Sequence, residues 1–385
     1  MPRNIWVLFI AQCCAMCAAP LVVFVGGLVG RELATFSELA TLPLALMVVG
    51  TASAVYPAAI LAQSIGRKRL FVIAMLIGAG ASLLAALAIA SASFLLFLLA
   101  AVLLGAVIAC VQQFRFAAME SVDAEQAPVA ISRLLLAGIV AAYVGPELVV
   151  WGKQWGQFEG GFYLLAGLYL IAAVVLWLGF SDRKLIAHQS GQAAKSISEL
   201  LRQPGILLAM SSAAIGFAIM SYIMTATPLS MTGVSGLSLE DTKWVIQSHI
   251  MAMFLPSLVS GWLIKALGFR KLIAAGVLIY AICIAIAWVD QTLIHYWLAL
   301  IFLGLGWNFL FVSGTALLPR VHAPQDSAQV QGLNDLVVFG AQAIASLSSG
   351  VLLIVIGWHG LLLSIVPLLF ILCYQLWRWP VIDQN

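Results

Sequence analysis

Twelve mostly apolar stretches follow one another along this chain, and each is long enough, at about 20 residues, to cross a bilayer as a helix. The predicted spans are residues 5–26, 40–62, 70–91, 93–116, 131–151, 162–180, 205–228, 243–265, 271–289, 294–316, 332–355 and 357–379. Charged residues make up 9% of the sequence, against roughly 25% in soluble globular domains. The sequence therefore predicts an all-α membrane protein with twelve transmembrane helices, held in a lipid bilayer.

Lysine and arginine are distributed unequally between the loops that join these spans. With the N-terminus placed in the cytoplasm, only three of the 18 fall on the outer side, namely Arg31, Lys153 and Lys243. We therefore expect a multi-pass protein of a bacterial cytoplasmic (inner) membrane, with both termini in the cytoplasm. A net charge of +3 is too small to indicate a nucleic-acid partner, and we expect a monomer.

The longest polar stretch divides the chain into two similar halves. Residues 181–204 are rich in Ser, Gln and Lys and predict a cytoplasmic linker between six-helix bundles at 1–180 and 205–385. The portion from 196 to 202 is a candidate short surface helix. Residues 63–69 and 265–271 occupy matching places in the two halves, and each predicts a tight turn with a glycine and a basic cluster. Such an internal repeat is typical of secondary transporters.

Two pairs of soft metal ligands lie on consecutive predicted helices. Met220 and Met224 are four residues apart, as are His249 and Met253, so each pair shares one helix face. Thioether sulfur and imidazole nitrogen favour a soft monovalent ion such as Cu(I). Methionine alone is often a filler of gaps in packing, but a histidine inside a membrane span is a functional candidate by default. We therefore predict a copper site of these four side chains.

Two cysteines of the first span share a helix face and could relay or co-ligate copper. These are Cys13 and Cys17. Cysteine also behaves as a small hydrophobic residue, and close helix contacts in membranes favour small side chains. Packing is the preferred interpretation of the pair.

Five polar residues are candidates for gating or coupling. Arg115 and Glu120, at the end of the fourth span, predict a cytoplasmic ion pair, and a lone Arg that reaches the interface is the alternative to it. Glu147, near the outer end of the fifth span, either binds a coupling proton or is wetted at the interface. Asn308 and Asp335 are the polar counterparts in spans ten and eleven.

The turn after the second span resembles a motif of the major facilitator superfamily, Gly-x-x-x-Asp-Arg-x-Gly-Arg-Lys. Gly66, Arg67 and Lys68 fit its end, whereas Gln63 stands at the place of the aspartate. The resemblance implies the fold of that superfamily, two pseudo-symmetric six-helix bundles, and a transporter that is not an enzyme. The sequence has no Gly-rich loop of the Walker type, which argues against ATP as the energy source.

Four segments resemble the CcoA-type copper importers within this superfamily: residues 220–229, 249–257, 304–311 and 331–335. In that family the Met-x-x-x-Met and His-x-x-x-Met motifs are the proposed copper ligands. The resemblance therefore implies a role as copper ligands for Met220, Met224, His249 and Met253. It also implies import of copper as the transported substrate, with no cofactor, and delivery to a cytoplasmic copper acceptor.

The resulting hypothesis is a copper importer, and two alternatives remain beside it. The first is a proton-coupled carrier of an organic solute such as a drug, a siderophore or a metabolite. The second is a membrane sensor or scaffold that transports nothing. The lack of a sizeable predicted domain outside the membrane argues against this second alternative.

Overall fold

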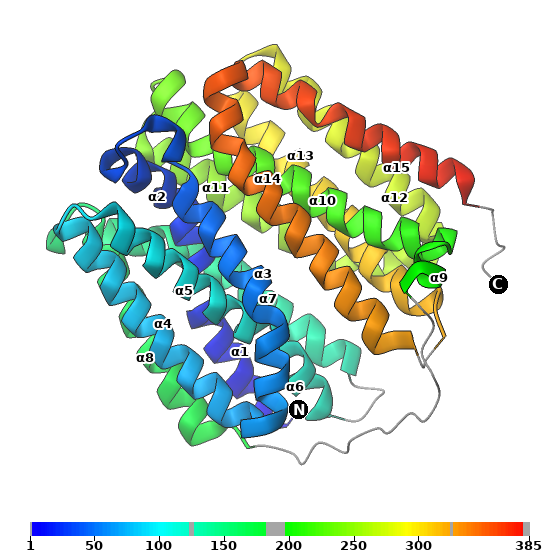
Figure 1. The fold of residues 1–385 in the computed structure, drawn as a ribbon, viewed down its shortest axis with the longest axis horizontal. Helices are drawn as coiled ribbons and strands as arrows, with labels where there is room; N and C mark the ends of the chain where they lie inside the picture. The colour runs from blue at the N-terminus through cyan, green and yellow to red at the C-terminus, as the bar shows by residue number, and fades with distance from the viewer. Residues whose placement is uncertain (1, 123–126, 182–196, 324–325, 380–385) are drawn as a thin grey trace. The chain divides into compact units, whose positions relative to one another are not determined.

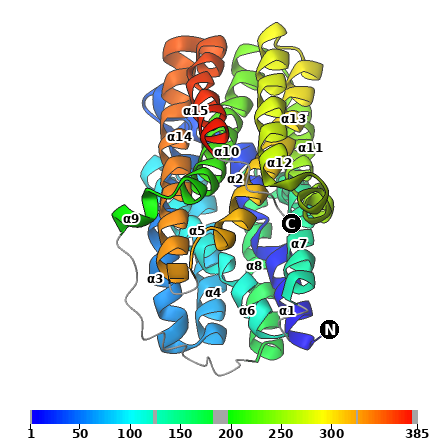
Figure 2. The same cartoon turned by 90° about the vertical axis from the view of Figure 1, so that its right-hand side faces the viewer.

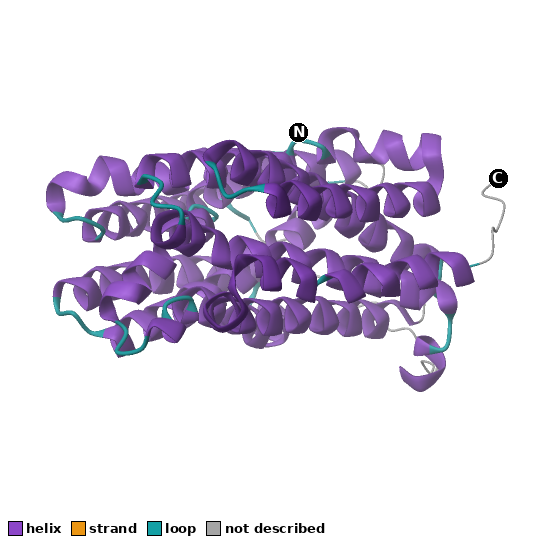
Figure 3. Ribbon diagram, turned by 90° about the horizontal axis from the view of Figure 1, so that it is seen from above, coloured by secondary structure: helices purple, strands orange, loops and turns teal. Residues whose placement is uncertain are grey.

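The computed structural model describes residues 2–122, 127–181, 197–323 and 326–379, and no strand occurs among them (Figure 3). Ten helical segments of this described part are long and apolar enough to cross a membrane. Two of them contain an internal glycine with a left-handed backbone, Gly268 (φ 78°) and Gly357 (φ 68°). Dividing the two long segments at these glycines, and joining residues 257–267 to the helix Leu239–Phe254 that precedes them, gives the predicted twelve spans, and the all-α prediction is confirmed.

The helices form two compact units, the first made of residues 1–186 and 238–251. Its helices, which Figure 1 draws from blue to green, are α1 (Arg3–Ala15), α2 (Ala18–Leu33), α3 (Leu42–Ile65), α4 (Arg67–Ala90), α5 (Phe94–Gln112), α6 (Phe114–Glu120), α7 (Ala127–Gly152), α8 (Glu159–Gly179) and most of α11 (Leu239–Phe254). Helix α4 packs between α5 and α8, and α3 packs against α5. A Cβ atom added to Gly105 of α5 would lie 1.9 Å from the carbonyl oxygen of Met47, so this contact of α3 and α5 requires glycine.

The second unit consists of residues 187–237 and 252–385. Its helices are α9 (Ile197–Leu201), α10 (Pro204–Leu229), α12 (Ser257–Val289), α13 (Leu293–Leu317), α14 (Ser327–Ser364) and α15 (Val366–Arg378). Helix α10 packs along α14 and α13, and α13 packs against α12 (Figure 2). Hydroxyl contacts fasten α10 to α14, since Thr225 Oγ1 lies 3.1 Å from Ser346 Oγ and Ser349 Oγ donates to the Tyr222 carbonyl at 2.6 Å.

The repeated turn that the sequence predicts has the same backbone in both halves. Gly66 (φ 85°, ψ 152°) joins α3 to α4, and Gly268 (φ 78°, ψ 162°) lies at the corresponding bend of α12. A side chain would be strained at such positive φ values, which explains the glycine at each turn. In the first turn, Arg67 Nη1 also donates to the Gln113 carbonyl at 3.4 Å and joins the start of α4 to the end of α5.

The units differ from the predicted halves at one helix. Residues 238–251, predicted in the second half, group with the first unit, and the boundary falls inside α11. Most of the predicted linker, residues 182–196, lies outside the described part of the chain. Helix α9 occupies the place where the sequence indicated a short surface helix.

Candidate functional site

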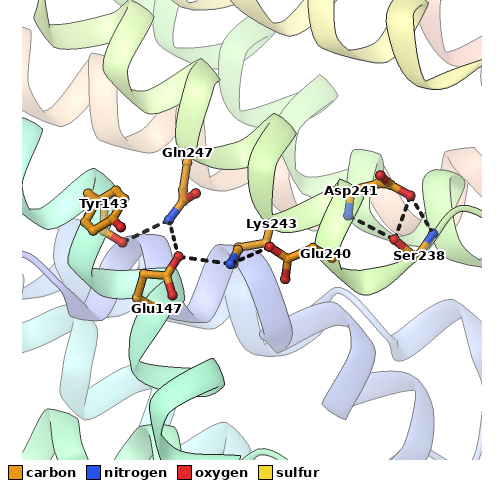
Figure 4. Close-up of polar contacts among 7 residues, drawn as sticks. All are labelled: Tyr143, Glu147, Ser238, Glu240, Asp241, Lys243 and Gln247. Carbon is orange, nitrogen blue, oxygen red and sulfur yellow. Dashed lines mark hydrogen bonds and ion pairs between the residues drawn. The ribbon is translucent and has the colours of Figure 1, made fainter.

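A polar network joins α7 and α11 in the first unit (Figure 4). The Nζ atom of Lys243 lies 2.9 Å from Oε1 of Glu147 and 2.7 Å from Oε1 of Glu240. Gln247 Nε2 donates to the Tyr143 carbonyl at 3.0 Å and to Glu147 Oε1 at 3.4 Å. The Glu147 carboxylate therefore receives a cation and an amide donor from the same neighbouring helix.

Helical spacing accounts for this arrangement. Tyr143 and Glu147 are one turn apart on α7, and Lys243 and Gln247 are one turn apart on α11, so two polar faces meet side by side. The side chains of Lys243 and Glu147 are 8% and 12% exposed, whereas that of Glu240 is 72% exposed. In such shielded surroundings a charge is tolerated only with a partner, which makes the Lys243–Glu147 contact the central one.

The start of α11 is fixed by a local hydrogen-bond pair. Ser238 Oγ donates to Asp241 Oδ2 at 2.6 Å, and the backbone N–H of Asp241 donates back to Ser238 Oγ at 3.0 Å. These bonds occupy donors at the helix start that have no partner within the helix. The cap therefore sets where the first turn of α11 begins, and with it the position of Lys243.

The four predicted copper ligands are all buried, but they are divided between the units. His249 belongs to the first unit, and Met220, Met224 and Met253 belong to the second. Every residue of α10 from 218 to 229 is buried, so burial of the two methionines does not single them out as ligands. Among the described residues, no group of three or more His, Cys, Asp or Glu side chains is arranged to hold a metal ion. The four-residue copper site stays a prediction.

The cysteines of the first predicted span lie where backbones pack closely. Cys17 Sγ donates to the Cys13 carbonyl at 3.1 Å, at the junction of α1 and α2. A Cβ atom on Gly145 of α7 would lie 2.8 Å from the Cys17 carbonyl oxygen. This contact between α2 and α7 fits the packing interpretation of the small side chains.

Asn308 holds three segments of the second unit together. Its Nδ2 donates to the Met253 carbonyl at 2.7 Å and to Ser257 Oγ at 2.6 Å, and its Oδ1 accepts from Ser260 Oγ at 2.8 Å. The side chain is fully buried, and each of its polar atoms is used. Asn308 therefore fastens α13 to α11 and α12 across the Pro256 region.

The other predicted gating residues are placed as follows. Arg115 is half-buried on α6, and Glu120 ends that helix with a side chain outside the described structure. Asp335 is half-buried on α14 and accepts a hydrogen bond from Asn334 Nδ2 at 3.2 Å. The Arg115–Glu120 ion pair stays a prediction.

Sequence reasoning selected Glu147 but missed its partners Lys243 and Gln247. The sequence did offer one indication, Lys243 itself. It is one of only three basic residues on the predicted outer side, and it is the first residue of the predicted eighth span. A cation at such a place needs an acid from another helix, and spacing within one helix does not reveal which acid that is.

The sequence pattern of the Major Facilitator Superfamily matches residues 8–242 and 209–383. The chain belongs to the major facilitator superfamily. This facilitator is 36% identical over 373 residues to the riboflavin transporter RfnT of Brucella anthropi, covering 95% of this chain and 93% of RfnT. It is 30% identical to YdeG of Bacillus subtilis, an uncharacterised transporter of the same type, over 94% of this chain and 88% of YdeG. The relatives are named as transporters, in line with the prediction that the chain is not an enzyme.

Solved structures of transporters share the fold of this facilitator. The nucleoside transporter NupG matches with a TM-score of 0.72 and 15% identity, over 99% of this chain and all of NupG. The human organic anion transporter MFSD10 matches with a TM-score of 0.71 and 11% identity, over 98% of this chain and all of MFSD10. The predicted superfamily is thus confirmed, whereas the closer resemblance to copper importers receives no support from these comparisons.

Proposed function

We propose that this facilitator carries a flavin, riboflavin or a close analogue, across a bacterial cytoplasmic membrane, as a monomer with both termini in the cytoplasm. The observation that carries the proposal is the similarity to RfnT, which extends over 95% of this chain. A match of that extent includes helices of both units. It favours the organic-solute hypothesis over the copper hypothesis.

We propose further that transport is coupled to protons and that Glu147 takes the coupling proton. A carboxylate can exchange a proton during a transport cycle, and Glu147 is a largely buried acid on α7. Protonation would cancel the charge that Lys243 contacts at 2.9 Å and leave the amide of Gln247 beside a neutral acid. Proton binding would thereby loosen α7 from α11.

The same network suggests how coupling would act on conformation. Transporters of this type alternate between two states by movement of bundles of helices. The bonds of Lys243 and Gln247 hold α11 against α7 within the first unit. Loosening these bonds would favour the state in which α7 and α11 separate.

Copper import remains a hypothesis that rests on four side chains and on the resemblance of their motifs. The similarity to the riboflavin transporter covers 95% of the chain, whereas the buried Met220 and Met224 are equally explained by packing in a fully buried stretch of α10. We therefore treat copper as a competing outcome of the transport experiment.

The test is uptake of radiolabelled riboflavin by bacteria that neither make riboflavin nor import it, with and without this chain. We expect faster uptake with the chain, inhibited by excess unlabelled riboflavin and not by adenosine or by copper kept reduced with ascorbate. Uptake equal to that of cells with the empty vector would overturn the flavin proposal. A rise in cell copper in place of riboflavin would restore the copper hypothesis.

A further inference from the structure

Five aromatic side chains from four helices of the second unit form one cluster. We call it the aromatic cluster, and its members are Phe217 on α10, Phe254 at the end of α11, Trp307 and Phe311 on α13, and Phe339 on α14. The Trp307 and Phe311 rings are stacked, with centroids 5.0 Å apart and an interplanar angle of 11°. These two side chains are one helical turn apart on α13, and their rings lie face to face as a stacked pair.

Phe217 and Phe254 pack against this stacked pair with their rings nearly perpendicular to it. The Phe217 centroid lies 5.1 Å from Trp307 and 5.0 Å from Phe311, both with near-perpendicular rings. Phe254 lies 6.0 Å from Trp307 in the same manner. Such stacked and edge-to-face pairs are the favourable aromatic arrangements, so the cluster holds its rings in fixed orientations.

The cluster has a buried base and an accessible side. Phe217 and Phe311 pack against buried Ala213, Ala214 and Val338. Yet Phe217, Phe311 and also Phe339 are only partly buried themselves. The aromatic cluster therefore offers ring surface to a molecule outside the hydrophobic base.

Trp307 carries a hydrogen-bond donor that the described residues leave unused. Its side chain is 4% exposed, and its Nε1 atom is buried with no acceptor in the described part of the chain. A buried indole N–H normally has a hydrogen-bond partner. Without one, the group loses its hydrogen bond to water and gains none in return, which costs free energy. The donor lies within the aromatic cluster, which points to an acceptor supplied by a bound molecule.

We propose that the aromatic cluster is the binding surface for the planar ring of the transported solute. The ring stacks against the cluster, and a carbonyl oxygen or ring nitrogen at its edge accepts the hydrogen bond of Trp307 Nε1. The chemical class is a flat heteroaromatic with acceptors at its edge, as in a flavin, and the inference rests on the proposed function. Phe217, Trp307 and Phe311 then determine specificity for the ring.

The methionines of α10 lie on the helix face that carries Phe217. Met220 and Met224 follow Phe217 at three and seven residues, a spacing that places all three on one helix face. Thioether sulfur makes favourable contacts with aromatic rings. Both methionines are buried, so packing beside the aromatic cluster accounts for the Met-x-x-x-Met motif without a metal.

The experiment measures riboflavin binding to the full-length chain in lipid nanodiscs, through quenching of flavin fluorescence. Trp307→Phe keeps an aromatic ring and removes the N–H, and we expect about fivefold weaker binding, equivalent to about 1 kcal/mol. Phe311→Leu removes the stacked ring, and we expect about threefold to tenfold weaker binding with reduced quenching. The matched controls are Trp262→Phe and Phe370→Leu, at side chains 68% and 69% exposed, which should bind as the wild type does.

Photolabelling of the wild-type chain with 8-azidoriboflavin gives a second measurement that depends on no variant. We expect labelled peptides from α10, α13 or α14 next to the aromatic cluster. Labelling elsewhere, or equal binding by Trp307→Phe, Phe311→Leu and the wild type, would overturn the inference and leave the proposed function standing. Failure of the wild-type chain to bind riboflavin at all would overturn both.

Discussion

The buried contact between Lys243 and Glu147 predicts that its two ends respond unequally to substitution. Among the residues that the structure describes, Lys243→Met leaves the Glu147 carboxylate with the Gln247 amide alone, 3.4 Å away. Removing one partner of a buried pair costs about 3–5 kcal/mol, and the residual exposure of this pair lowers our expectation to about 2–4 kcal/mol of unfolding free energy. Glu147→Gln should cost less, about 1–2 kcal/mol, because Lys243 keeps Glu240 at 2.7 Å.

The assay is a double-mutant cycle on reversible unfolding in mixed detergent micelles. We expect the Glu147→Gln, Lys243→Met double variant to be more stable than the sum of the single effects predicts, by about 1–3 kcal/mol of coupling energy. Glu240→Gln is the control, with an expected effect below about 1 kcal/mol, since that carboxylate is largely exposed. Additive single effects, with coupling under about 0.5 kcal/mol, would refute the assignment of a central ion pair.

Four further outcomes are expected. Gly105→Ala should abolish a stable fold, because its Cβ would meet the α3 backbone, whereas Gly80→Ala, with nothing within 4 Å, should melt as the wild type does in scanning fluorimetry. Asn308→Ala should lower the unfolding free energy by about 2–4 kcal/mol, since it removes the three hydrogen bonds of a fully buried side chain; an unchanged melting temperature would contradict that. Glu147→Gln should carry riboflavin without acceleration by a proton gradient, while exchange of labelled for unlabelled riboflavin persists; retained acceleration in vesicles would exclude Glu147 as the proton site. His249→Ala should leave cell copper content unchanged, as measured by mass spectrometry, and a fall in copper would favour the copper hypothesis.

The sequence was most informative where one physical constraint acts on each segment alone. Apolar runs of membrane-spanning length identified the spans, because a bilayer requires an apolar surface and satisfied backbone groups from every helix. The repeated turn was predictable for a similar reason. Its backbone has a positive φ at Gly66 and at Gly268, and glycine is the residue type that adopts such a φ without strain.

Contacts between distant segments were harder to predict. Helical spacing placed Met220 and Met224 on one face, yet it did not reveal that Phe217 of that face meets Trp307 and Phe311 of α13. Trp307 lies inside the motif of residues 304–311, but its importance comes from ring contacts and an unused donor, which only the three-dimensional structure reveals. Lys243 was likewise recognisable in the sequence as a lone cation, and Glu147 as a lone acid. Nothing in the sequence indicated that the two form an ion pair.

Riboflavin counterflow with the purified chain in liposomes tests the central claim most directly. Vesicles loaded with unlabelled riboflavin are diluted into a trace of labelled riboflavin, so that accumulation of label requires a carrier and no other energy source. The account predicts transient accumulation of label that protein-free vesicles lack and that loading with adenosine does not produce. Label that never exceeds the level of protein-free vesicles would contradict the account.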